Sequence, residues 1–307
     1  MKTKPIAVIA VAATLITGLA ACSSTASAAS PGGSSSVSPV QKLLDDAPVA
    51  SASELPAVAA AIKARGTFKV GATDTSPLFS FKDPTTGTYT GFDAVLTEML
   101  AKYIIGKPNV TRAQISVPTR ETLLESHSVD AVIATYTITP ARAALVSFAG
   151  PYFSDGQAIL VRKDEKGITK PSDLNGKTIV TETGSTTAAD IKKLAPNVNV
   201  VLFDTNDECL QALEQNRADA YVLDQSIVGG DALQNPTQVK VVGSKFTTEP
   251  YGIGVPKDEA AFKTFINNWL KKIYKDGSWT ALWKATIGAA IGGTPPKPPV
   301  IGSVPGS

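Results

Sequence analysis

Short apolar runs alternate along the chain with longer stretches in which apolar residues recur at helical spacing. The apolar runs predict strands at Thr67 to Ala72, Ile115 to Val117, Ala131 to Ala134, Ala158 to Val161, Thr178 to Thr181, Val200 to Phe203, Ala220 to Leu223 and Val239 to Val242. The stretches between them predict amphipathic helices, as does the later series Phe262, Phe265, Ile266, Trp269, Leu270 and Ile273. Strands that alternate with helices indicate an α/β protein whose sheets are mainly parallel.

Polar residues follow the predicted strand Ala131 to Ala134, at the end of a strand where open α/β sheets bind ligands. Thr135 and Thr137 come first, and Thr139 suits the residue that caps a helix, with a proline after it. Arg142 lies one turn into that helix. Hydroxyl and free N–H groups beside a guanidinium form a receptor for a carboxylate. An ordinary capped helix with a surface arginine is the alternative that these residues alone leave open.

Two strand ends later in the chain carry similar residues. The strand Thr178 to Thr181 leads into a loop that contains Thr183, Ser185 and Thr186 and that starts the next helix. Asp224 directly follows another predicted strand. Each could simply cap the helix that it precedes, and a capping role can coexist with ligand binding.

The N-terminus has the features of an export signal. Lys2 and Lys4 precede an apolar run that ends at Leu19, and small residues lead from there to Cys22. This pattern predicts a signal peptide over residues 1–21. The ending LAAC resembles a bacterial lipobox, which implies cleavage before Cys22 and a lipid on its sulfur; a plain cleaved signal is the alternative. The acyl chains would hold the protein on the outer face of the cell membrane.

Two stretches have a composition that predicts no fixed structure. Residues 22–52 are rich in Ser, Ala, Pro and Gly, so they bury too little apolar surface to offset the entropy of ordering, and we expect a flexible linker. Residues 291–307 are rich in Pro and Gly, and we expect a disordered tail.

Charge and composition exclude several classes of function. Removal of residues 1–21 takes away two of the 29 Lys and Arg and none of the 27 Asp and Glu, so the mature chain has no net formal charge. Nucleic acid is therefore not an expected partner, because phosphate binding needs clustered basic residues. The chain has one His and no Cys and His pattern at ligand spacing, so we expect no metal site and no cofactor.

Several separated motifs together resemble one family. ATYTIT, the residues Pro140 to Arg142, SFAGPYF and GQAILVRK stand in the order found in the polar amino-acid-binding proteins, also called solute-binding protein family 3. These bacterial receptors serve ABC importers. The resemblance runs from about Gly66 to Trp283, and it implies a monomeric extracytoplasmic receptor whose partners are an amino acid and an ABC permease.

The family also implies a two-lobed periplasmic-binding-protein fold of type II. Lobe 1 would span residues 53–157 and 250–290, and lobe 2 would span residues 158–249. Two crossing strands, near Gln157 to Arg162 and near Thr248 to Gly252, would join the lobes. The ligand is then expected in the cleft between them.

The resemblance assigns roles to the polar residues of the cleft. Arg142 would grip the α-carboxylate of an amino acid as a two-pronged fork, supported by Thr137. The loop from Thr183 to Thr186 would donate backbone N–H groups to the same carboxylate. Asp224 matches the family's acceptor for the α-ammonium.

Two residues bear on the side chain of the ligand. Arg120 stands where relatives that bind aspartate or glutamate carry an arginine for the distal carboxylate; the alternative is a solvated arginine at a helix start. Asp74, after the first strand, resembles the glutamine-binding pattern and would repel a carboxylate unless Arg120 pairs with it. We therefore expect an acidic amino acid, glutamate or aspartate, with glutamine or asparagine as the alternative.

An enzyme on the same scaffold is a further alternative. Some periplasmic cyclohexadienyl and arogenate dehydratases share this fold, and Glu182 could be imagined as a general acid or else as a surface carboxylate. Because fold alone does not carry function, we expect no enzyme. A tethered ligand sensor that signals to a membrane partner is the last alternative.

Overall fold

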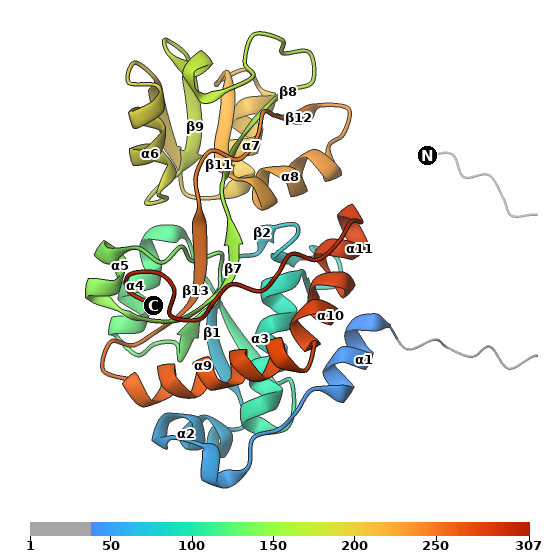
Figure 1. Cartoon of the computed structure of the whole chain (residues 1–307). Coiled ribbons are helices and arrows are strands. Elements are labelled where there is room, and N and C mark those ends of the chain that lie inside the picture. Colours follow the sequence, from blue (N-terminus) through green and yellow to red (C-terminus); the bar gives the residue numbers. More distant parts are fainter. Residues whose placement is uncertain (1–37) are drawn as a thin grey trace, which may run out of the picture. The chain divides into compact units, whose positions relative to one another are not determined.

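Two five-stranded sheets organise residues 38–307, which are the residues that this computed structural model describes (Figure 1). The strand order is β5-β1-β6-β13-β7 in lobe 1 and β10-β9-β11-β8-β12 in lobe 2. In each sheet the first three strands pair in parallel, and the other pairings are antiparallel. The predicted signal peptide and Cys22 lie outside the described residues.

The strands of lobe 1 are β1 Phe68–Ala72, β5 Val110–Gln114, β6 Ala131–Val132, β7 Ser147–Asp155 and β13 Glu249–Val255, with a small separate sheet of β2 Thr75–Ser76, β3 Ser80–Lys82 and β4 Tyr89–Thr90. Its helices are α1 Pro39–Asp46, α2 Ala57–Arg65, α3 Phe92–Ile105, α4 Arg120–Glu125, α5 Pro140–Leu145, α9 Ala260–Lys275, α10 Ser278–Ala285 and α11 Ile287–Ile291, with short 3-10 turns at Ala52–Glu54 and Val117–Thr119.

The strands of lobe 2 are β8 Gln157–Arg162, β9 Thr178–Glu182, β10 Asn199–Phe203, β11 Ala220–Asp224 and β12 Val239–Val242. Its helices are α6 Thr187–Leu194, α7 Asn206–Glu214 and α8 Gln225–Gln234, with a 3-10 turn at Pro171–Leu174. None of the helices in the part of the chain that the structure describes is both long and apolar enough to cross a membrane.

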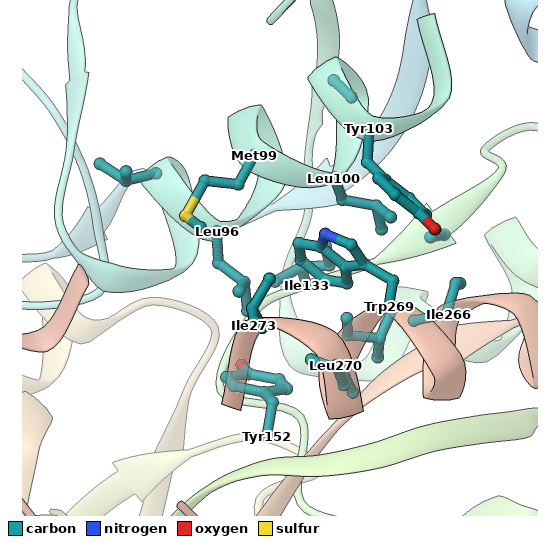
Figure 2. Packing of buried hydrophobic residues seen from close by; sticks show 14 of the residues in the cluster. Leu96, Met99, Leu100, Tyr103, Ile133, Tyr152, Ile266, Trp269, Leu270 and Ile273 are labelled. Atoms are coloured by element: carbon teal, nitrogen blue, oxygen red, sulfur yellow. The ribbon is translucent and has the colours of Figure 1, made fainter. Parts of the chain in front are cut away.

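The core of lobe 1 forms where α3 and α9 pack on one another and on the sheet. Figure 2 shows Trp269 of α9 reaching toward Leu100 and Tyr103 of α3. Trp269 is fully buried, and its ring centroid lies 6.4 Å from that of Tyr103. Burial of such side chains contributes about 1.5 to 3 kcal/mol each, and it explains the amphipathic pattern that predicted α9.

Two neighbouring strands join the lobes. β7 and β13 pair antiparallel from Ser147 opposite Val255 to Asp155 opposite Glu249, and they pass together from lobe 1 toward lobe 2 (Figure 1). The chains approach so closely there that a Cβ on Gly156 would lie 2.2 Å from the Thr247 carbonyl oxygen, so the crossing needs glycine. The first crossing is therefore the end of β7, and the segment expected to cross, Gln157 to Arg162, is a strand inside the sheet of lobe 2.

Part of the predicted linker is folded. Helix α1 begins after Ser38, whose hydroxyl accepts the Gln41 N–H at 3.1 Å, and it buries Leu43 and Leu44 in the core of lobe 1. The prediction of a flexible linker to residue 52 is wrong over this helix. The average composition of residues 22–52 hides the short amphipathic helix sequence PVQKLLDD.

The predicted disordered tail also packs on lobe 1. The Gly302 N–H donates to the Gly150 carbonyl at 2.9 Å, and Ile301 and Val304 are partly buried against the core. Figure 1 shows this segment running across lobe 1 to the C-terminus near α4 and α5. The prediction fails here because two aliphatic side chains anchor a stretch whose composition is otherwise that of a tail.

Candidate ligand-binding cleft

A small cavity lies between the two lobes, at the ends of their strands. Polar and charged side chains make up most of its lining. The lobes touch beside it, since the Arg142 Nη2 donates to the Gly184 carbonyl at 3.0 Å and the Asn206 Nδ2 donates to the Thr75 carbonyl at 2.9 Å. The lining residues come from both lobes: Val117, Arg120, Thr135, Thr137 and Arg142 from lobe 1, and Glu182, Ser185, Thr186, Leu223, Asp224 and Ile227 from lobe 2.

Arg142 is held in a defined orientation at this cavity. Helix α5 begins as predicted, because the Thr139 hydroxyl accepts the Arg142 N–H at 3.2 Å. The Nη1 of Arg142 donates to the Thr137 carbonyl at 2.9 Å, and its Nε lies 3.8 Å from a carboxylate oxygen of Glu121. Burial and the neighbouring Arg120 lower the pKa of Arg142, but a guanidinium stays charged at neutral pH. Its remaining N–H groups can therefore serve an anion in the cavity.

Arg120 is a buried cation at the same cavity. It begins α4, is only 3% exposed, and lies over the Tyr136 ring at 5.0 Å. Within residues 38–307 it makes no ion pair, and its Nε has no hydrogen-bond partner. The alternative of a solvated helix-start arginine is wrong. A buried charge with no ion-pair partner is costly, so an anionic or polar ligand would offset that cost.

Thr135 adopts a conformation that its surroundings impose. Its φ angle is +45°, which threonine rarely adopts, and its N–H donates to a carboxylate oxygen of Asp93 at 2.8 Å. The other oxygen of Asp93 accepts the Tyr152 hydroxyl at 2.8 Å. Burial raises the pKa of Asp93 to about 7. The sequence reasoning missed Asp93, although an acid inside the apolar stripe of α3 was a signal.

Asp224 lies at the lobe 2 side of the cavity, next to β13, which is one of the two hinge strands that join the lobes. It ends β11, is 7% exposed, and accepts the Tyr251 hydroxyl from β13 at 2.6 Å. Its side chain makes no capping hydrogen bond to α8, so the purely capping alternative is wrong. Burial and the nearby Asp155 and Glu249 raise the pKa of Asp224. A cation bound at this position would relieve that clustering of negative charge.

The lobe 2 loop contributes two of its three predicted residues. Ser185 and Thr186 line the cavity, and the Thr186 hydroxyl donates to Glu249 at 3.1 Å. Thr183 does not line it, because its N–H and hydroxyl both donate to the Phe203 carbonyl, at 2.7 and 3.1 Å. Thr183 therefore anchors the loop to β10, and its predicted place at the ligand is wrong.

Asp74 lies apart from the cavity. The hairpin of β2 and β3 turns the chain away after β1, and Asp74 lines a separate hollow that also contains Lys82 and Asp207. In the described part of the chain no ion pair joins Asp74 to Arg120. The expected pairing of Asp74 with Arg120 is therefore wrong, and Asp74 is not among the residues that line this cavity.

Glu182 lines the cavity although it was not among the predicted ligand residues. It is the last residue of β9 and is 8% exposed, so it is not a surface carboxylate. Burial raises the pKa of Glu182 to about 7, against the opposite effect of Arg120. Val117, Leu223 and Ile227 are apolar lining residues that also escaped prediction. Nothing in the sequence of a buried turn, strand or helix marks which apolar side chain faces a cavity.

One group of possible metal ligands lies outside the cleft. The ligand atoms of His127, Asp258 and Glu259 are within 4.8 Å of one another on the surface of lobe 1. The His127 Nε2 lies 3.5 Å from Asp258 Oδ1, and both side chains are more than half exposed. Exposed polar side chains in contact account for this arrangement.

The chain is similar to known proteins in both sequence and structure. Residues 68–288 match the family described as bacterial extracellular solute-binding proteins, family 3. A glutamine-binding protein of Geobacillus stearothermophilus is 39% identical over 209 residues, which are 67% of this chain and 79% of that protein. The glutamate-binding protein GluB of Corynebacterium glutamicum is 32% identical over 234 residues, 73% of this chain and 79% of that protein. The solved structure of an ancestral arginine-binding protein bound to glutamine has 36% identity and a TM-score of 0.68, and the match covers 75% of this chain and 99% of that one.

Proposed function

Because the chain belongs to the bacterial extracellular solute-binding proteins of family 3, we propose that its cleft binds an acidic amino acid, glutamate or aspartate, and delivers it to an ABC importer. Family membership makes the chain an extracytoplasmic solute receptor with a type II periplasmic-binding fold, and not an enzyme. The choice of ligand and the roles of single residues belong to the proposal.

The two charged ends of an amino acid match opposite sides of the cavity. Arg142 with Thr137 would take the α-carboxylate, helped by Ser185 and Thr186 from the other lobe. Asp224, in its cluster of negative charge, would take the α-ammonium. Donors from both lobes reach one ligand only when the lobes meet, so binding would favour the closed state.

The observation that carries the acidic ligand is the state of Arg120. It is buried at the cavity with no ion-pair partner among the described residues. A carboxylate on the ligand side chain would supply the missing counter-charge, in hydrogen bonds worth about 1.5 to 3 kcal/mol. Asp74, which would repel a ligand carboxylate, lines a different hollow, and its position therefore favours such a ligand.

Glutamine or asparagine is the second candidate, and Glu182 favours it. A side-chain amide could accept a hydrogen bond from Arg120 and donate one to Glu182, which lines the same cavity. Both kinds of ligand appear in the names of the relatives.

The anchor and the partners complete the proposal. Residues 1–21 would be a signal peptide, and a lipid on Cys22 would hold a monomeric receptor on the outer face of the membrane, beside its ABC permease. Replacement of Cys22 by serine is expected to release the protein from the membrane fraction into the soluble one. Unchanged fractionation in that variant would contradict the lipid anchor.

Titration calorimetry of the purified protein against the twenty amino acids tests the ligand. At pH 6 we expect glutamate or aspartate to bind most tightly and apolar amino acids not to bind. Tighter binding of glutamine or asparagine would support the second candidate. No binding of any polar amino acid would overturn both.

A further inference from the structure

We propose that Glu182 is a specificity-determining residue that gives the receptor a pH-dependent preference. The cleft accepts an acidic ligand side chain when the Glu182 carboxyl is protonated and an amide side chain when that carboxyl is ionised. This proposal rests on the proposed function of the cleft as an amino-acid site. It deepens that function, because it makes one cavity able to take either class of ligand according to the pH outside the cell.

The geometry places Glu182 and Arg120 at one cavity, from opposite lobes. Glu182 ends β9 in lobe 2 and Arg120 begins α4 in lobe 1, and each is more than nine-tenths buried. Among the described residues they form no ion pair with each other. Burial and Arg120 are the influences that act on the Glu182 carboxyl, with no hydrogen bond among them. Both groups are therefore free to serve a ligand.

The donor and acceptor properties of the two ligand classes differ at such a pair. A primary amide carries an acceptor oxygen for Arg120 and an NH₂ donor for an ionised Glu182. A carboxylate carries only acceptors, so it suits Arg120 but is repelled by an ionised Glu182. Once Glu182 holds a proton, its O–H becomes a donor to the same carboxylate.

Other charged and titratable groups surround Glu182. They come from α4, α5, α7, α8 and β11: Arg120, Arg142, Cys209, Asp231, Tyr221 and Asp224. Burial raises the pKa of Cys209 and of Tyr221, so both stay neutral between pH 6 and 8. Burial also raises the pKa of Asp231 to about 8, but Asp231 does not line the cavity. Asp224 also lines the cavity, and burial raises its pKa too. Because Asp224 would hold the α-ammonium that both ligands carry, its titration would change both affinities alike, and the ratio between them would depend on Glu182.

The sign of the pH dependence follows from which form each ligand binds. Burial raises the pKa of Glu182 to about 7, so the protonated form dominates at pH 6 and the ionised form at pH 8. The side chain of free glutamate, with a pKa of about 4.3, stays ionised over this range. Glutamate affinity should therefore fall as the pH rises through 7, and glutamine affinity should rise.

Calorimetric titration of glutamate and of glutamine at pH 6, 7 and 8 tests the proposal in the parent and in Glu182→Gln. In the parent we expect the ratio of the glutamate Kd to the glutamine Kd to rise between pH 6 and 8, by up to about 100-fold if each ligand binds one form only. In Glu182→Gln, which cannot ionise, we expect the ratio to change by less than about 3-fold.

Asp231→Asn is the matched control, because it removes a second buried acid with a raised pKa that does not line the cavity. It should keep the pH dependence of the ratio. A constant ratio in the parent, or an unchanged pH dependence in Glu182→Gln, would overturn the role of Glu182 while leaving the receptor function standing. Failure of both ligands to bind at every pH would overturn the proposed function and this inference together.

Discussion

At the scale of single residues, the two arginines of the cleft differ in what already holds them. Arg142 is fixed by the carbonyl oxygens of Thr137 and Gly184 and has Glu121 nearby. Among the described residues Arg120 makes no ion pair, and its guanidinium lies over the face of the Tyr136 ring. The first is therefore oriented before a ligand arrives, and the second depends on the ligand for a counter-charge.

Alanine substitutions should separate these two roles. Arg142→Ala is expected to abolish binding of every amino acid, because the α-carboxylate is common to all of them. Arg120→Ala is expected to weaken glutamate by about 10- to 150-fold, the loss of about 1.5 to 3 kcal/mol, and to affect glutamine less. Calorimetry with both ligands measures the difference, and Arg120→Lys serves as the variant that keeps the charge but not the fork. An equal loss for both ligands in Arg120→Ala would contradict a role in selectivity.

Sequence reasoning placed residues well where local chemistry determines the position. Thr139 caps α5 and sets Arg142 one turn later, which is a matter of residues adjacent in the chain. The prediction failed for Thr183. Which residues of this loop face the cavity depends on a hydrogen bond from Thr183 to Phe203, which lies on another strand. Asp93 was missed for a similar reason, since its partner Thr135 is 42 positions away.

At the scale of elements, the hinge strands and the C-terminal segment show how distant parts of the chain support the cleft. Tyr251 of β13 holds Asp224, and Glu249 at the start of the same strand accepts from Thr186. On lobe 1, Val304 packs against the cluster that contains Ile138 and Val146, on either side of α5. The segment after α11 is thus part of the support of the helix that carries Arg142.

The stability of lobe 1 should depend on the two anchors of that segment. Replacement of both Ile301 and Val304 by serine removes two partly buried aliphatic side chains and puts hydroxyl groups in their place. We expect this change to lower the free energy of unfolding by about 2 kcal/mol. Differential scanning calorimetry would then show a Tm lowered by about 4 to 8 °C. Val300→Ser is the control, because Val300 is 73% exposed in the same segment. An equally small effect of both changes would show that the segment adds nothing to stability.

Most of the alternation of strands and helices was predictable because those elements carry their own periodicity. The strand expected at Ile115 to Val117 was wrong: the strand there is β5 Val110–Gln114, whose partly exposed residues form no apolar run. The ends of the chain were not, because composition averaged over 15 or more residues hides a few anchoring side chains. Leu43 and Leu44 hold α1, and Ile301 and Val304 hold the C-terminal segment. The first crossing was predicted at β8 and lies at the end of β7. The error arose because both strands are apolar and only Gly156 separates them.

At the scale of the whole molecule, the contacts beside the cavity describe a receptor with its lobes together. Arg142, at the cavity, meets Gly184 of lobe 2, and Asn206 of α7 meets Thr75 of lobe 1. On α8 of lobe 2, Gly230 lies against lobe 1, where a Cβ would stand 3.1 Å from a carbon of Pro77 and 3.4 Å from one of Leu78. This glycine leaves room for closure, because a larger side chain would occupy the space that lobe 1 takes.

A side chain at Gly230 should therefore act as a wedge. Gly230→Leu leaves every residue of the cavity in place, yet we expect it to weaken ligand binding by about 5- to 150-fold, since overpacking costs about 1 to 3 kcal/mol in the closed state alone. Small-angle scattering should also show a smaller decrease in the radius of gyration when ligand is added. Gly229→Leu is the matched control, because a Cβ at this neighbouring helical position meets nothing within 4 Å. Both changes raise helix propensity by up to about 1 kcal/mol, so neither should lower the Tm of the ligand-free protein. Equal affinities in the two variants would mean that this contact between the lobes is not required for binding.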